Sequence, residues 1–182
     1  MNYCNIKKND IANGPGVRIV LFVSGCTHHC KGCFQPETWN FDYGEEFTEE
    51  VQDRIIEYMK PSYVDGLTIL GGEPFEPVNQ RGLIDFVKKV RETYPFKTIW
   101  CYSGYTYDVD IVPENGKAHC EVTGDLLENI DVLVDGEFIL EKKNLSIVFR
   151  GSENQRIIDV GKSLGQNNVE IIPDSTFKGM IQ

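Results

Sequence analysis

Three cysteines lie within eight residues, in the stretch Cys26-Thr27-His28-His29-Cys30-Lys31-Gly32-Cys33. Thiolate sulfur binds iron–sulfur clusters and zinc, and spacings of four and three residues let one loop hold one compact metal centre. A 4Fe–4S cluster normally takes four cysteines, so three leave one iron with an open coordination position that can bind a reactant. We therefore predict that Cys26, Cys30 and Cys33 hold a catalytic 4Fe–4S cluster.

Structural zinc is the alternative on ligand types alone, with His28 or His29 as the fourth ligand. We expect both histidines to be solvated or to lie behind the metal ligands instead of binding the metal. The remaining cysteines, Cys4, Cys101 and Cys120, form no CxxC pair and share no loop. We interpret them as buried or incidental thiols, and we predict no second cluster.

A second candidate site is the run Gly71-Gly72-Glu73-Pro74, which follows a short predicted strand over residues 67–70. Glycines at the end of a strand let the backbone approach a small ligand closely. Alone, such a run is an ordinary glycine-rich turn. Its combination with the three-cysteine loop is far more specific than either part.

An alternation of strands and helices must position these loops. The β-branched run 17–23 is too continuous for a half-exposed strand, and it ends at the cysteine loop, which is typical of a buried parallel strand. Helices are predicted from Thr48 onward and over about 79–94. Further strands are expected over 98–101, 131–134 and 146–149, with 169–172 as a candidate for the last.

This alternation predicts an α/β fold with a parallel sheet and right-handed crossovers. A closed eight-unit barrel usually needs about 250 residues. For a chain of 182 residues we therefore expect an open, partial (β/α) barrel of mostly parallel strands, formed by a single domain over 1–182. Residues 161–182 are a candidate C-terminal extension, and 112–127, which lack clear periodicity, are expected to be a surface excursion.

The composition limits the function classes. A net charge of −10 repels phosphate backbones, so nucleic acid is not an expected partner. Apolar residues make up 41% and charged residues 25% of the chain, as in ordinary globular proteins, and no run approaches the roughly 20 apolar residues of a membrane helix. The polar start has no apolar core typical of a secretion signal. We expect a cytoplasmic protein that does not enter a membrane.

The three-cysteine loop followed by the Gly-Gly-Glu-Pro run resembles the radical S-adenosylmethionine superfamily. The resemblance implies that the backbone of Gly71, Gly72, Glu73 and Pro74 holds the amino group of the methionine moiety. Superfamily members often carry an aromatic residue immediately before the third cysteine, where this chain has Gly32. The resemblance further implies that the backbone from Gly32 through Cys33 to Phe34 contacts the adenine and that Ser103 contacts the methionine carboxylate.

Further runs resemble the activases of anaerobic ribonucleoside-triphosphate reductase. They are Asn13–Arg18 (NGPGVR), Cys33–Trp39 (CFQPETW), Trp100–Tyr105 (WCYSGY), Asp131–Phe138 (DVLVDGEF) and Arg150–Arg156 (RGSENQR). The resemblance implies one-electron cleavage of S-adenosylmethionine at the cluster. The resulting 5′-deoxyadenosyl radical would remove a hydrogen from the Cα of a glycine in the reductase.

The same resemblance implies a low-potential electron donor such as flavodoxin. It also implies a place for Arg18 near the partner's glycine loop and for Asp131 and Asp135 near a cation site. Two rivals remain within enzymes, namely an activase of another glycyl radical enzyme and a small radical enzyme acting on a metabolite. A zinc-stabilised interaction module is the rival from a different class.

Overall fold

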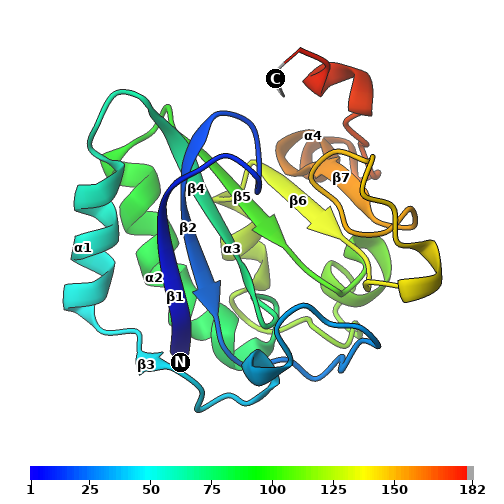
Figure 1. Cartoon of the computed structure of the whole chain (residues 1–182), viewed down its shortest axis with the longest axis horizontal. Helices are drawn as coiled ribbons and strands as arrows, with labels where there is room; N and C mark the ends of the chain where they lie inside the picture. Colours follow the sequence, from blue (N-terminus) through cyan, green and yellow to red (C-terminus); the bar gives the residue numbers. More distant parts are fainter. Residues whose placement is uncertain (180–182) are drawn as a thin grey trace.

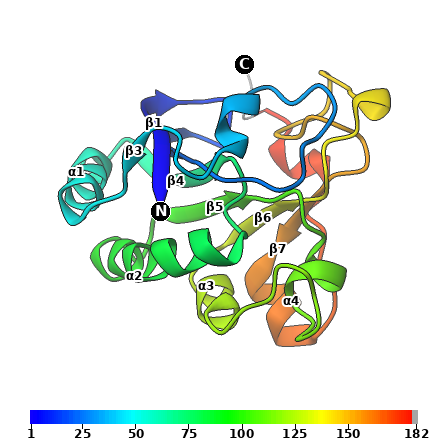
Figure 2. The ribbon, with the colours of Figure 1, turned by 90° about the horizontal axis from the view of Figure 1, so that it is seen from below.

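The computed structural model describes residues 1–179, and within them one seven-stranded sheet is covered on one face by helices (Figures 1 and 2). The strand order is β3-β1-β2-β4-β5-β6-β7. The strands are β1 (Asn2–Asp10), β2 (Val17–Val23), β3 (Glu45–Glu46), β4 (Val64–Gly71), β5 (Thr98–Tyr102), β6 (Val132–Asp135) and β7 (Arg156–Asp159). The helices are α1 (Glu49–Met59), α2 (Pro77–Thr93), α3 (Thr123–Glu128) and α4 (Val160–Gln166).

The sheet is mixed, so the prediction of mostly parallel strands is not confirmed. Only the central strands β2, β4, β5 and β6 pair in parallel. The pairs β1–β2, β1–β3 and β6–β7 are antiparallel. A short turn over 11–16 joins β1 to β2, and such a connection permits only antiparallel pairing. The α/β class is confirmed, with a helix crossing between β2 and β4 and between β4 and β5.

Strand predictions near the chain ends were less successful than those at the centre. The run 146–149 is not a strand, because Asn144 accepts a hydrogen bond from the Ser146 amide and the chain turns there. The last strand is β7 instead, and the run 169–172 contributes one bridge, between Ile171 and Ile158. The sequence also gave no sign of β1, whose residues are mostly polar and half exposed because it lies near the edge of the sheet.

The segment 112–127 is not a surface excursion, contrary to expectation. It contains the start of α3, and Ala118, Leu126 and Leu127 are buried. Gln80 of α2 fastens it, since its side-chain amide donates to the Ala118 carbonyl (2.6 Å) and accepts from the Thr123 hydroxyl (2.7 Å). A helix of six residues is too short to show a clear apolar period.

The two faces of the sheet have separate cores. The face under the helices holds the larger one, which includes Ile19 and Leu21 of β2. The opposite face holds a smaller cluster, in which Trp100 of β5 and Val134 of β6 pack with Phe177 from the C-terminal segment. Burial on both faces explains the unbroken apolar run of β2. No helix within residues 1–179 is long and apolar enough to span a membrane.

Candidate active site

A pocket of about 640 Å³ lies at the carboxyl ends of β2, β4, β5 and β6. A cavity of this size fits a small-molecule ligand. The residues predicted from the sequence that line it are Cys26, Cys30, Cys33, Phe34, Gly71, Gly72, Glu73 and Ser103. The fold thus brings the cysteine loop and the Gly-Gly-Glu-Pro run, about forty residues apart in sequence, to one place.

Two thiols of the cysteine loop, those of Cys26 and Cys30, have raised pKa values. Burial raises the pKa of Cys26 to about 12, and burial together with the charge of Glu137 raises that of Cys30 to about 11. Metal ligation must therefore displace their protons. Among residues 1–179, no three His, Cys, Asp or Glu side chains converge closely enough to form a ready-made metal site. The donor chemistry of the three thiols and their shared place in the pocket lining fit a cluster.

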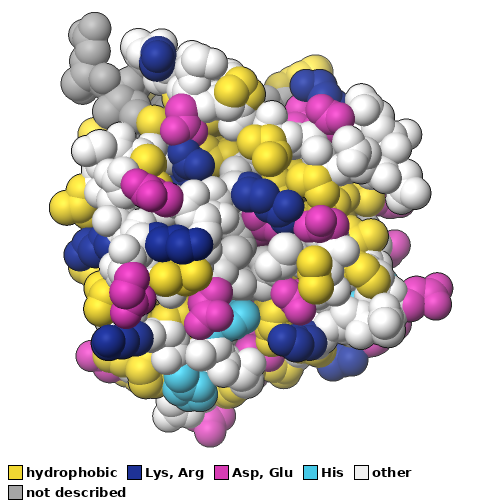
Figure 3. Space-filling model, turned by 90° about the vertical axis from the view of Figure 1, so that its right-hand side faces the viewer, with side chains coloured by type: hydrophobic (Ala, Val, Ile, Leu, Met, Phe, Trp, Pro, Cys, Tyr) yellow, Lys and Arg dark blue, Asp and Glu magenta, His cyan; other side chains and the backbone are white. Residues whose placement is uncertain are grey.

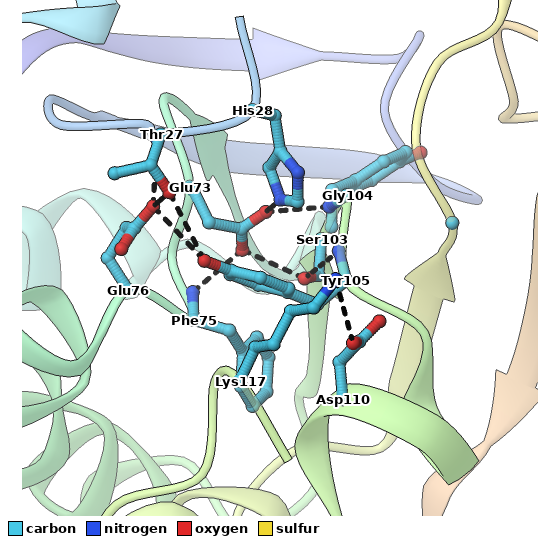
Figure 4. Close-up of polar contacts among 12 residues, drawn as sticks. Thr27, His28, Glu73, Phe75, Glu76, Ser103, Gly104, Tyr105, Asp110 and Lys117 are labelled. Atoms are coloured by element: carbon cyan, nitrogen blue, oxygen red, sulfur yellow. Dashed lines mark hydrogen bonds and ion pairs between the residues drawn. The ribbon is translucent and has the colours of Figure 1, made fainter. Parts of the chain in front are cut away.

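Glu76, which precedes α2, anchors the cysteine loop. Its Oε1 accepts hydrogen bonds from the Thr27 amide (2.8 Å) and the Thr27 hydroxyl (2.6 Å). The hydroxyl of Tyr105, from the loop after β5, lies 3.4 Å from the same oxygen. Glu76 is buried, so these bonds are shielded from water. The residue after Cys26 is thereby tied to the start of a helix (Figure 4).

The Glu73 carboxylate is the centre of the site's hydrogen bonding (Figure 4). Its Oε1 accepts from the Phe75 amide (2.8 Å) and the Ser103 hydroxyl (2.8 Å). Its Oε2 accepts from the Gly104 amide (2.7 Å) and lies 3.0 Å from Nε2 of His28. With a side chain only 1% exposed, Glu73 joins the cysteine loop, its own loop and the end of β5. Sequence reasoning assigned its backbone to the cofactor and missed this role of the side chain.

His28 is itself part of the pocket lining and is bonded to Glu73. Burial lowers the pKa of His28, but the hydrogen bond and negative charge of Glu73 outweigh burial, and the net shift is upward. His29 turns away, with its Nδ1 near the Thr27 carbonyl (3.1 Å) and its ring against Trp39. Each histidine therefore has a partner within the chain other than a metal.

Gly72 packs against the start of the cysteine loop. The Gly72 amide donates to the Val23 carbonyl and the Glu73 amide to the Gly25 carbonyl, both at 2.8 Å. A β-carbon at Gly72 would lie 2.6 Å from the Gly25 carbonyl oxygen, so a side chain there would displace the residue preceding Cys26. The glycine is needed for the packing of the two loops as well as for any ligand.

Of the remaining predicted cofactor contacts, Ser103 and Phe34 line the pocket, whereas Gly32 and Pro74 are not among its lining residues. The Ser103 hydroxyl donates to Glu73 and accepts from the Tyr105 amide (3.0 Å), so its proton is already engaged. Phe34 is 98% exposed at the pocket mouth. Gly32 has a φ of +77° and faces Leu140, whose Cδ1 would lie 3.1 Å from an added β-carbon. A glycine at this position satisfies both the left-handed backbone and the close approach.

The three residues predicted near a partner or cation do not meet. Arg18 is completely buried in β2. Asp131 and Asp135 lie at opposite ends of β6, and each is paired within the chain, Asp131 with Arg91 (2.7 Å) and Asp135 with Arg156 (2.9 Å to Nε).

Arg18 instead supports one wall of the pocket. Its Nε donates to the Thr68 hydroxyl, which donates in turn to the carbonyl of Asn13, a lining residue, with both distances 2.7 Å. Its Nη2 donates to the Leu67 and Thr98 carbonyls at 2.7 and 2.9 Å. Burial lowers the pKa of Arg18 to about 10. The buried guanidinium is held by neutral acceptors.

The opposite wall is the loop over 136–155, which follows β6. Gln155 closes this loop, because its Oε1 accepts from the amides of Gly151 (2.8 Å) and Ser152 (3.1 Å) and its Nε2 donates to the Gly136 carbonyl (2.9 Å). Gly136, Gly151 and Gln155 all line the pocket. Figure 3 shows that hydrophobic side chains are exposed among basic and acidic ones on the side of the molecule that bears this loop.

The chain matches the family model of the 4Fe-4S single cluster domain over residues 12–158. It is 41% identical to the anaerobic ribonucleoside-triphosphate reductase-activating protein of Haemophilus influenzae, over 86% of the chain and 97% of the relative. The proteins of the same name from Escherichia coli K12 and Enterobacteria phage T4 are each 38% identical, over 85% and 86% of the chain and 96% and 93% of the relative. The match to a 4Fe–4S domain favours an iron–sulfur cluster over zinc.

Proposed function

Because the chain belongs to the family of anaerobic ribonucleoside-triphosphate reductase-activating proteins, we propose that it binds S-adenosylmethionine beside a 4Fe–4S cluster held by Cys26, Cys30 and Cys33 and installs a glycyl radical on that reductase. The chain is thus an activating enzyme with an iron–sulfur cofactor. The observation that carries the proposal is one pocket that is lined both by the three cysteines and by Gly71, Gly72 and Glu73.

When bound, the cluster and S-adenosylmethionine supply the one-electron cleavage that starts hydrogen abstraction. The residues of the chain bind the cluster and S-adenosylmethionine and orient them. Three cysteine thiolates would leave one iron open toward the pocket, and backbone carbonyls of the Gly71–Pro74 loop would accept from the methionine ammonium. The amides of Gly72 and Glu73 are already engaged with Val23 and Gly25, and the Glu73 carbonyl accepts from the Glu76 amide and the Asn79 side chain. The carbonyls of Gly71 and Gly72 are therefore the groups we assign to the ammonium.

Exclusion of water is the other task of the pocket. Its lining includes the apolar side chains of Leu70, Phe138, Ile147 and Phe149. A radical reacts with almost any neighbouring group, so an apolar wall without a general acid or base suits this chemistry. The buried polar groups beneath it, centred on Glu73, are bonded to one another.

The partner would reach the pocket through its exposed mouth. Phe34 and Leu145 are 98% and 86% exposed there, and exposed apolar side chains around a site are typical of a protein-binding surface. We assign the partner contact to them because Arg18 is buried and both aspartates are paired. The helices cover one face of the sheet only, which supports an open partial barrel whose other face admits a glycine loop. A low-potential donor such as flavodoxin would supply the electron.

The test is activation of the reductase. The reconstituted protein, reduced without oxygen and mixed with S-adenosylmethionine and the anaerobic reductase of the same organism, should give it nucleotide-reducing activity. The Cys30→Ala variant should not activate the reductase. Cys120→Ala, which alters a thiol outside the pocket lining, should activate it as wild type does. If the reductase stays inactive while a pyruvate formate-lyase gains activity, the named partner is wrong. If neither gains activity although S-adenosylmethionine is consumed, a small-molecule substrate becomes the better hypothesis.

A further inference from the structure

The C-terminal segment after the family match, residues 159–179, folds back onto the sheet beside the pocket loop. It leaves β7, forms α4 and returns along β7, where the Ile172 amide donates to the Ile157 carbonyl (2.8 Å) and the Asp159 amide to the Glu170 carbonyl (2.9 Å). A short 3-10 helix over Asp174–Phe177 follows. The sequence of this segment carries no cofactor or metal motif.

Phe177 supports the pocket wall from behind. Its ring is 4% exposed and packs edge-on against Phe149 (centroids 5.3 Å apart) and Trp100 (5.8 Å), which also contact each other (5.4 Å). Phe149 lines the pocket and has a φ of +52°, which a non-glycine residue adopts only when its surroundings hold it there. Phe177 thus helps to hold a strained pocket residue.

Asp174 holds the next residue of the same wall. Both its carboxylate oxygens lie 2.5 Å from Nη2 of Arg150. Arg150 lines the pocket and its side chain is 14% exposed, whereas that of Asp174 is 44% exposed. A charge-assisted contact to a mostly buried guanidinium is stronger than an ordinary surface pair.

Part of the wall's support comes from within its own loop, where Arg150 donates to the Val148 and Gln155 carbonyls (3.3 and 3.2 Å). The stretch 136–155 consists of turns and one short 3-10 helix, and apart from an isolated bridge between Lys143 and Ser152 it is outside the sheet ladder. Gln155 closes its base, and the C-terminal segment adds the aromatic contact to Phe149 and the ion pair to Arg150. Binding is tighter when the groups that contact a ligand are ordered beforehand.

We propose that residues 159–179 are a positioning element, in which Phe177 and Asp174 hold the wall Phe149–Arg150 in the form that binds S-adenosylmethionine. The proposal rests on the assignment of this pocket to S-adenosylmethionine. Phe177 and Asp174 contact Phe149, Trp100 and Arg150, none of which is a predicted cluster ligand, so the segment acts on affinity for the ligand and leaves assembly of the cluster unchanged. The three cysteines lie on the loop after β2, which meets the 136–155 loop where Gly32 faces Leu140.

The test compares Phe177→Ala and Asp174→Asn with wild type in reconstituted, oxygen-free protein. Calorimetric titration with S-adenosylmethionine should give a dissociation constant raised roughly tenfold for Phe177→Ala and about threefold for Asp174→Asn, with unchanged iron content. Trypsin should cleave more rapidly after Lys142 and Lys143, which lie exposed in the released loop. This second readout does not depend on ligand binding or catalysis.

Two controls separate positioning from general loss of stability. Leu126→Ala removes a buried side chain from α3 in the other core and should lower stability without raising the dissociation constant. Phe177→Leu should restore most of the affinity lost in Phe177→Ala. Unchanged affinity for S-adenosylmethionine in both Phe177→Ala and Asp174→Asn overturns the proposal, whether or not trypsin cleavage accelerates. If wild type itself fails to bind S-adenosylmethionine, the proposed function fails instead, and unchanged cleavage of Phe177→Ala would then overturn the supporting role of the segment.

Discussion

Replacing Glu73 by glutamine tests the central polar network. The variant keeps the shape of the side chain but turns one acceptor oxygen into a donor nitrogen. If the nitrogen takes the place of Oε1, it meets the Phe75 amide, and if it takes the place of Oε2, it meets the Gly104 amide. Neither backbone amide can reverse its polarity, whereas the Ser103 hydroxyl and the His28 ring can adapt. In either orientation one buried N–H loses its acceptor.

An unsatisfied buried donor costs about 1–3 kcal/mol, and the surviving bonds weaken with the loss of the negative charge. Relief of the cost of burying that charge offsets part of this. We expect Glu73→Gln to lower the free energy of unfolding by about 2 kcal/mol, which in a chain of this size lowers Tm by roughly 4–8 °C.

The measurement is thermal unfolding of the metal-free protein followed by circular dichroism. Glu37→Gln makes the same chemical change at an exposed site near the cysteine loop and should leave Tm unchanged. Glu73→Gln should also reduce iron uptake, because the bond that ties His28 to residue 73 weakens when the negative charge is removed. A Tm equal to that of wild type would refute the view that Glu73 organises the site.

Three further outcomes are expected. Cys30→Ala should fail to assemble a stable 4Fe–4S cluster, since three thiolates are available and none can be spared. The control variant Cys120→Ala should retain its iron. Full iron content in Cys30→Ala would disprove the ligand assignment. Gly72→Val should lower both iron content and S-adenosylmethionine affinity, because its side chain would press on Gly25, and normal iron content would contradict that packing. Leu145→Asp should raise the reductase concentration needed for half-maximal activation roughly tenfold by removing an exposed apolar contact, with S-adenosylmethionine affinity within about twofold of wild type. An unchanged reductase requirement would place the partner elsewhere.

The sequence predicted the elements whose apolar pattern is strong. The run that became β2 and the amphipathic helices α1 and α2 lie close to their expected bounds. Strand β1, which lies second from the edge of the sheet, escaped notice because its outward residues face water, and β7 is only four residues long. The antiparallel pairs follow from the connections, which a strand count does not reveal.

The site was predictable only where residues close in sequence carry the chemistry. Spacing alone picked out the cysteine loop, whereas the bonds from Thr27 to Glu76 and from His28 to Glu73 join residues 49 and 45 positions apart. Such pairs depend on which strands are neighbours. Arg18 shows a second limit, because a charged side chain predicts exposure, while here backbone carbonyls and a hydroxyl make complete burial possible.

The most direct test of the account is electron paramagnetic resonance of the reductase after incubation, without oxygen, with the reduced protein and S-adenosylmethionine. We expect the doublet of a glycyl radical, which should collapse to a single line when the reductase carries glycine deuterated at Cα. The same sample prepared with Cys30→Ala should show no such signal. Formation of 5′-deoxyadenosine without any radical on the reductase, in a mixture where the two proteins are shown to form a complex, would contradict the account.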